Sequence, residues 1–246
     1  MKDDLLSASA SVNWAVSNFP SFDERLGNWV DENVHVTIKE TPPDVPNNVI
    51  VAEDKVPLPL EFNAEVGAYI NAIRSSLDIL ATSLVQRYGV SVPEEDVYFP
   101  VVRDRETFDR GKYKGHKFVQ ALPAPERDIV EKLKPYAGGN DLLWDLHRLD
   151  ILRKHFRLLT VQTNPAAFRI TGWGLSNYFT RISTGWACNP GETMLGLVTK
   201  NAPHFEMHFT GFIGLNEPGP LARVPVVHAL DTFAKLAQSI IMRFDH

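Results

Sequence analysis

The sequence predicts an α+β fold, in which a helical core carries an antiparallel sheet that comes mainly from the last third of the chain. Apolar side chains recur at helical spacing over residues 63–88, and a second amphipathic segment covers residues 141–156. After residue 160 the chain changes to short β-branched and aromatic runs separated by glycine, a pattern typical of antiparallel strands. We expect one domain over residues 1–246, with a division into two subdomains near residue 160 as the alternative.

Two short helices are expected at the start of the chain. Residues 5–19 form the first, around Trp14. Ser21 and Glu24 have the spacing of a capping box, in which the side chains at the first turn satisfy free backbone N–H groups. A second helix is therefore expected over residues 22–31.

Two extended segments follow. Residues 34–40 alternate apolar and polar side chains, which predicts a half-buried strand. Residues 48–62 form the second segment. Pro57 and Pro59 within it favour the edge of a sheet, where a missing N–H breaks no ladder hydrogen bond.

The strongest helical signal lies in residues 63–88. Asn63 can cap the start of this helix, and Gly89 can end it. Between them, apolar side chains three or four residues apart form one stripe: Val66, Ile70, Ile73, Leu77, Leu80, Leu84 and Tyr88.

Three more helices are predicted downstream. Residues 123–136 begin with proline, which is tolerated in a first turn. The GGN run at 138–140 separates this helix from the next, which should cover residues 141–156. Residues 226–244 form an amphipathic C-terminal helix.

Composition limits the class of protein. The chain has 246 residues, 44% of them hydrophobic, and a formal net charge of −5, so bulk charge does not favour binding to nucleic acid. Its one cysteine, Cys188, can form neither an internal disulfide nor a thiolate zinc site, which fits a reducing cytosol. The start, MKDDLL, lacks the pattern of a signal peptide, and no apolar run is long enough to cross a membrane. We expect a cytoplasmic protein.

Arg148 and His155 face the same side of the predicted 141–156 helix, two turns apart. This Arg-x6-His spacing resembles the motif of HEPN domains, helical proteins found among bacterial toxins and defence ribonucleases. The resemblance implies a homodimer in which two motifs face each other and cleave RNA without a metal. His155 would act as general acid or base, and Arg148 would hold the phosphate. The structural alternative is that basic residues near a helix C-terminus are stabilised by the helix dipole.

About residues 63–160 are also similar to a family of uncharacterised bacterial proteins. The motifs that carry the similarity are IRSSLDILATSLV (73–85), YFPV (98–101), LKPY (133–136) and LWDLHRLDILRKH (143–155). Ile79 stands where that family tends to have histidine. The similarity implies a bacterial source and no particular activity.

Arg74 and Asp78 are four residues apart on the long helix and can form an ion pair. An ion pair near an apolar stripe needs further partners, so we expect contact with His147 and Asp150 on the 141–156 helix. Two interpretations stay open. The four residues form either a polar network that shapes a site or an ion pair that locks two helices together.

A second chemical pattern lies in PHFEMHF. If this segment is a strand, His204, Glu206 and His208 project from one face. Two imidazoles and a carboxylate could ligate zinc or iron. The alternative is that they are the polar residues on the solvent-exposed face of a half-buried strand. No fourth ligand can be named, so no metal or other cofactor is predicted.

The basic loop at 103–117 contains Phe108 and Tyr113 among its charges. Such a loop could contact RNA through phosphate charge and base stacking. It also holds several acids, so a solvated loop is the alternative.

Three functions are consistent with these patterns. The first in rank is a non-catalytic protein that associates with itself or with a partner, because no specific catalytic motif is present. The second is a HEPN-like ribonuclease that uses Arg148 and His155. The third is a metal-dependent enzyme that uses His204, Glu206 and His208.

Overall fold

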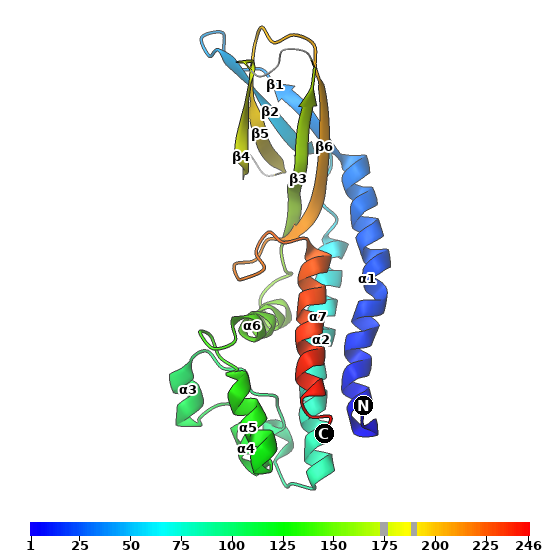
Figure 1. Ribbon diagram of the computed structural model, residues 1–246, viewed down its shortest axis with the longest axis vertical. Coiled ribbons are helices and arrows are strands. Elements are labelled where there is room, and N and C mark those ends of the chain that lie inside the picture. Colours follow the sequence, from blue (N-terminus) through cyan, green and yellow to red (C-terminus); the bar gives the residue numbers. More distant parts are fainter. Residues whose placement is uncertain (173–176, 188–190) are drawn as a thin grey trace.

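The structure is a computed structural model that describes residues 1–172, 177–187 and 191–246, except for the side chains of 181–187. Cys188 lies outside the described residues. The molecule is elongated, with the sheets at one end and the helices at the other, and both chain ends lie at the helical end (Figure 1). The predicted α+β class is confirmed.

Helices make up most of the described chain. They are α1 (Leu6–Asn33), α2 (Leu60–Tyr88), α3 (Arg105–Arg110), α4 (His116–Ala121), α5 (Ala124–Leu133), α6 (Asp141–His155) and α7 (Val226–Met242). The strands are β1 (Val34–Lys39), β2 (Asn47–Asp54), β3 (Val161–Thr171), β4 (Phe179–Ala187), β5 (Glu192–Thr199) and β6 (Glu206–Leu215).

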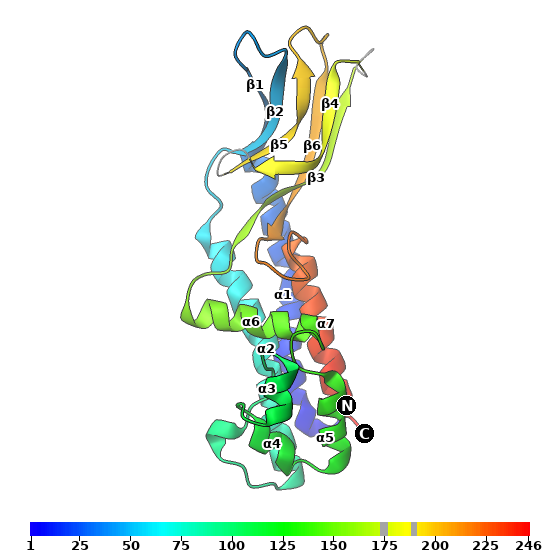
Figure 2. The same cartoon turned by 90° about the vertical axis from the view of Figure 1, so that its left-hand side faces the viewer.

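The strands form two antiparallel sheets. One contains β1, β2, β5 and β4 in this order, and the other pairs β3 with β6. The smaller sheet lies against the larger one (Figure 2), where β1 contacts β6 and β3 contacts β5. The last third of the chain supplies β3 to β6, as predicted, while β1 and β2 come from the N-terminal part.

The predicted edge position of the second extended segment is wrong. β2 ends at Asp54, so Pro57 and Pro59 lie beyond it in the connection to α2. Without a proline inside it, β2 can pair on both sides, with β1 and with β5. The prolines therefore end the strand and do not place it at an edge.

The two short N-terminal helices are one helix. α1 continues through Pro20, so Ser21 is not an N-cap. A proline inside a helix costs about 3 kcal/mol. The apolar stripe continues across the proline, however, and packs against α2 and α7. Its buried members are Ala8, Val12, Ala15, Phe19, Phe22, Leu26, Trp29 and Val30.

The long helix matches its predicted extent, with one difference at its start. α2 begins at Leu60 and not at Asn63. Asn63 is buried, and its Nδ2 donates a hydrogen bond to the carbonyl of Leu159 (2.7 Å), which fastens the connection before β3 to α2. Gly89 ends the helix in the left-handed conformation (φ 59°), as predicted.

Two other helices are shorter than expected, and α6 ends one residue early at His155. α5 stops at Leu133 because Lys134 precedes Pro135, and a residue before proline is disfavoured in the α conformation. α7 ends at Met242. The basic loop contains α3, which was not predicted.

The helical end is built around α1, α2 and α7, which run side by side while α6 crosses them (Figure 2). Their apolar faces form one continuous buried core that extends to the sheets. Among the described residues, no helix combines the length and the apolar character that a membrane span requires.

Candidate functional site

α6 carries four of the predicted site residues, His147, Arg148, Asp150 and His155, and its packing decides where they point. The Asn140 side chain accepts a hydrogen bond from the Leu143 backbone N–H (3.1 Å), which fixes the start of the helix. Leu143, Leu146 and Leu149 are fully buried. The leucines pack against α2 and α7, while Arg148 faces the loop before α7 and Arg153 lies against Gly67 of α2.

Arg74 of α2 is fully buried, and its guanidinium has a partner on each side. Nη1 donates to Asp78 Oδ1 (2.9 Å), Nη2 to the carbonyl of Phe99 (3.0 Å) and Nε to His147 Nδ1 (3.3 Å). The guanidinium also lies 4.8 Å from the centre of the Tyr98 ring, a cation–π distance. Asp78 Oδ1 accepts a second hydrogen bond from the Phe99 backbone N–H (3.0 Å). The network therefore joins α2, α6 and the segment that holds Tyr98 and Phe99.

His147 is neutral in this network. Because Arg74 Nε can only donate, His147 Nδ1 must accept, and the ring proton lies on Nε2. The pKa of His147 is lowered to about 3, mainly by burial and in addition by the positive charges of Arg74 and Lys154. At neutral pH this imidazole has no proton that it can give up easily, so it is unsuited to act as a general acid.

Two basic residues of α6 are held by buried carboxylates one turn earlier. Arg148 Nη2 lies 2.5 Å from Asp145 Oδ1, and Lys154 Nζ lies 2.5 Å from Asp150 Oδ2. Each carboxylate is only 2% exposed. Burial raises the pKa of Asp145, and the contact with Arg148 opposes that shift. Removal of either cation would leave a buried carboxylate without its counter-charge.

A third ion pair follows α6. Arg157 contacts both carboxylate oxygens of Glu217, at 2.6 and 2.8 Å. Glu217 also accepts a hydrogen bond from the Thr160 backbone N–H (2.7 Å). Although burial opposes the change, these contacts lower the pKa of Glu217. The pair fastens the loop before α7 to the connection between α6 and β3.

Arg148 and His155 do not share a partner. Arg148 donates to the carbonyl of Pro218 in addition to its ion pair. That loop comes so close that a Cβ on Gly219 (φ +149°) would lie 2.6 Å from the Asp145 carboxylate. His155 is exposed and lies about 10 Å farther along the helix axis. The structure thus brings Arg74, Asp78 and His147 together, and it leaves Arg148 and His155 separate within one chain.

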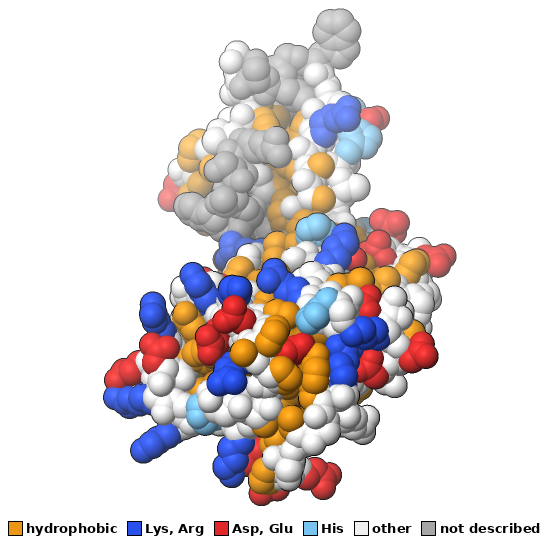
Figure 3. Space-filling model, turned by 60° about the horizontal axis from the view of Figure 1, so that its bottom comes forward, with side chains coloured by type: hydrophobic (Ala, Val, Ile, Leu, Met, Phe, Trp, Pro, Cys, Tyr) orange, Lys and Arg blue, Asp and Glu red, His pale blue; other side chains and the backbone are white. Residues whose placement is uncertain are grey.

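The predicted RNA-contacting loop (103–117) holds six lysines and arginines and three acidic residues, but its arginines are ion-paired. Phe108 and Tyr113 stack on each other, with ring centres 5.3 Å apart, so neither ring is free on both faces. Acidic and basic side chains are interspersed over the visible face of the helical end (Figure 3). Each arginine of the loop is paired with an acid: Arg103 with Asp104, Arg105 with Asp109 and Arg110 with Glu106.

The candidate metal ligands lie at the start of β6. His208 Nε2 is 3.7 Å from Glu206 Oε2 and 3.4 Å from Thr171 Oγ1, while His204 precedes the strand. Across the part of the chain that the structure describes, no three His, Cys, Asp or Glu side chains cluster as metal ligands would. The use of these residues in a metal site stays a prediction.

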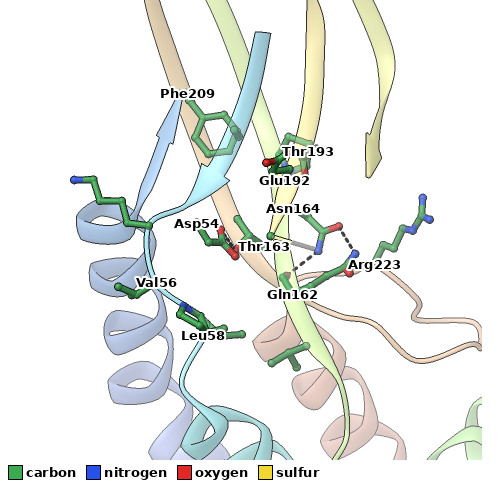
Figure 4. A pocket seen from close by; sticks show the side chains of 16 residues that line it. Asp54, Val56, Leu58, Gln162, Thr163, Asn164, Glu192, Thr193, Phe209 and Arg223 are labelled. Carbon is green, nitrogen blue, oxygen red and sulfur yellow. Dashed lines mark hydrogen bonds between the residues drawn. The ribbon is translucent and has the colours of Figure 1, made fainter. Parts of the chain in front are cut away.

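A cavity of about 790 Å³ lies where the sheets meet the helices (Figure 4). We call it the junction cavity. It is bounded by the end of β2 and its connection to α2, by β3, β5 and β6, and by the loop before α7. The lining residues that matter most here are Asp54, Val56, Leu58, Thr163, Asn164 and Phe209. Because they come from separate stretches of sequence, no local motif predicts the cavity.

Asp54 is the charged group at the centre of this cavity (Figure 4). Thr163 Oγ1 donates a hydrogen bond to Asp54 Oδ1 (3.0 Å). Oδ2 has no hydrogen-bond or ion-pair partner among the residues that the structure describes. Burial raises the pKa of Asp54, and the hydrogen bond from Thr163 opposes that shift. The cavity therefore presents a carboxylate oxygen that is available to a ligand.

Comparisons with protein-family models, with curated proteins and with solved structures found no match to this chain. The resemblances to HEPN domains and to the bacterial family therefore stay predictions.

Proposed function

We propose that this protein acts by association, without catalysis, and that it holds a small molecule in the junction cavity. The observation that carries the proposal is the cavity itself, which combines apolar walls with one central carboxylate. Small-molecule sites commonly enclose about 300–1,000 Å³ and often lie between two structural layers. Val56 and Leu58 supply apolar surface on one side, and Phe209 supplies it on the other.

The contacts of α6 favour binding over catalysis. The ion pairs of Arg148, Lys154 and Arg157 are each made to a buried carboxylate, which is what a structural role requires. His147 is held neutral by its surroundings. A ribonuclease reaction through Arg148 would have to break its contacts with Asp145 and the Pro218 carbonyl before the guanidinium could reach a phosphate.

Binding of the neutral dye Nile red, whose emission shifts to the blue in apolar surroundings, tests the proposal. Leu58→Trp adds bulk inside the junction cavity. Leu60→Trp, two residues away, is a matched control because Leu60 is 67% exposed and does not line the cavity. We expect the native protein and Leu60→Trp to bind the dye with equal affinity and Leu58→Trp to bind it at least about tenfold more weakly, a loss of about 1.4 kcal/mol.

Equal binding by all three proteins would place the dye elsewhere and contradict the proposal, and so would the absence of binding to the native protein. Circular dichroism of both variants shows whether a loss of binding comes from unfolding. Cytoplasmic location and a homodimeric state belong to the same proposal. Fractionation of cells and sedimentation of the purified protein test them.

A further inference from the structure

We infer that the junction cavity selects amines: molecules with an apolar body and a protonated ammonium group that donates to Asp54 Oδ2. This inference rests on the proposed function, since it names the class of ligand for the same cavity. It starts from the available oxygen of Asp54 and from the apolar side chains around it (Figure 4).

The charge of Asp54 has no counter-charge within the described chain. Among the residues that the structure describes, no lysine, arginine or histidine side chain forms an ion pair with it, and its one side-chain hydrogen bond comes from the neutral hydroxyl of Thr163. Half-buried carboxylates of this kind are stabilised by a cation that enters with its own donors. An ammonium group has three such donors.

The other charged residues of the lining do not compete for this role. Glu192 is already ion-paired with Lys39 on β1. Arg223 is exposed and extends away from Asp54 (Figure 4), and Lys55 is exposed as well. An anionic ligand would therefore meet the uncompensated carboxylate of Asp54 at the centre of the cavity, which is unfavourable.

A divalent metal ion fits this lining less well than an amine does. Calcium and magnesium need about six oxygen ligands, and several of them are usually carboxylates. Here one carboxylate is available, and its neighbours are the hydroxyl of Thr163 and the amide of Asn164. The Asn164 amide is partly engaged, because Nδ2 donates to the carbonyl of Gln162 (3.0 Å).

The apolar walls determine the rest of the ligand. Phe209 lies across the cavity from Val56 and Leu58, so a chain or ring attached to the ammonium group would contact both sides (Figure 4). Val56 is 46% exposed, and a ligand that covers it would remove apolar surface from water. An arylalkylamine has both features.

Three probes that share a phenylpropyl skeleton and differ in their terminal group separate the contributions of charge and shape. They are 3-phenylpropylamine, 3-phenylpropan-1-ol and 3-phenylpropanoate, titrated by calorimetry. The informative variant is Asp54→Asn, which keeps an oxygen for Thr163 and removes the charge. The matched control is Glu53→Gln, because Glu53 neighbours Asp54 in β2 and points to the opposite face of the sheet.

We expect the native protein to bind the amine at least about tenfold more tightly than the alcohol, because a charge-assisted hydrogen bond is stronger than a neutral one. The carboxylate probe should bind most weakly. The preference for the amine should disappear in Asp54→Asn and persist in Glu53→Gln.

Equal binding of amine and alcohol, or an unchanged preference in Asp54→Asn, would overturn the inference and leave the proposed binding function in place. Failure of all three probes together with binding of Nile red would overturn the selection of amines alone. Failure of all three probes and of Nile red would overturn both proposals.

Discussion

Replacement of Asp78 by alanine tests whether the Arg74 network stabilises the fold. Asp78 Oδ1 accepts hydrogen bonds from Arg74 Nη1 (2.9 Å) and from the Phe99 backbone N–H (3.0 Å). The Asp78→Ala variant leaves Arg74, which is fully buried, without its only counter-charge among the described residues. Such a loss inside a protein costs about 3–5 kcal/mol.

The Asp78 side chain is 28% exposed, so water can reach part of the site and the lower end of that range applies. We expect the free energy of unfolding to fall by about 3 kcal/mol, which for a chain of this length lowers Tm by about 6–12 °C. Asp78→Asn should be intermediate, because the amide oxygen can still accept from the Phe99 N–H.

Urea denaturation followed by far-UV circular dichroism measures the change. Asp128→Ala is the control, since Asp128 and Lys132 form an exposed ion pair of the same length on α5 (2.9 Å). That variant should change stability by less than about 0.5 kcal/mol. If Asp78→Ala proves no more destabilising than Asp128→Ala, Arg74 does not depend on its counter-charge and our reading of the network is refuted.

Three further predictions concern α6 and the loop after α3. Total bacterial RNA in EDTA should stay intact with the native protein, whereas cleavage that both Arg148→Ala and His155→Ala abolish, with folding preserved, would establish the ribonuclease. Because the pKa of His147 is about 3 in the folded protein and about 6.5 when unfolded, its contribution to stability is complete above pH 6.5 and is lost as the pH falls toward 3. Its NMR ring signals should therefore not titrate between about pH 5 and 8, and a midpoint near 6.5 would contradict this. Gly111→Ala should cost about 1–3 kcal/mol, because φ is +66° and the new Cβ would lie 2.6 Å from a histidine ring. Gly138→Ala, also at positive φ (+78°) but with open space around it, should cost less in the same thermal melt.

Periodicity predicted the helices that bury a regular apolar stripe. α2 and α6 lie within a few residues of their expected bounds for this reason. The prediction failed near Pro20, where the capping-box spacing of Ser21 and Glu24 indicated a new helix although the apolar stripe continues across it. Tertiary packing decides such conflicts, and a single sequence shows the local signals but not the tertiary contacts.

The candidate sites were predictable only in part. The spacing of Arg74 and Asp78 indicates a pair, and its expected contact with α6 is present through His147. The junction cavity was missed because it depends on contacts between distant segments. Asp54 and Thr163 are 109 residues apart and meet only because β3 passes beside the end of β2. No pattern within either segment signals that meeting.

The connections between the two ends of the molecule determine how they can move. The chain passes between helices and sheets at residues 33–34, 55–59, 156–160 and 216–225. A domain attached by a single linker can rotate about it as a hinge, whereas four chain connections restrict rotation of the sheets relative to the helices. A ligand should therefore enter and leave the junction cavity through small rearrangements of side chains and loops, while the helices and sheets keep their relative positions.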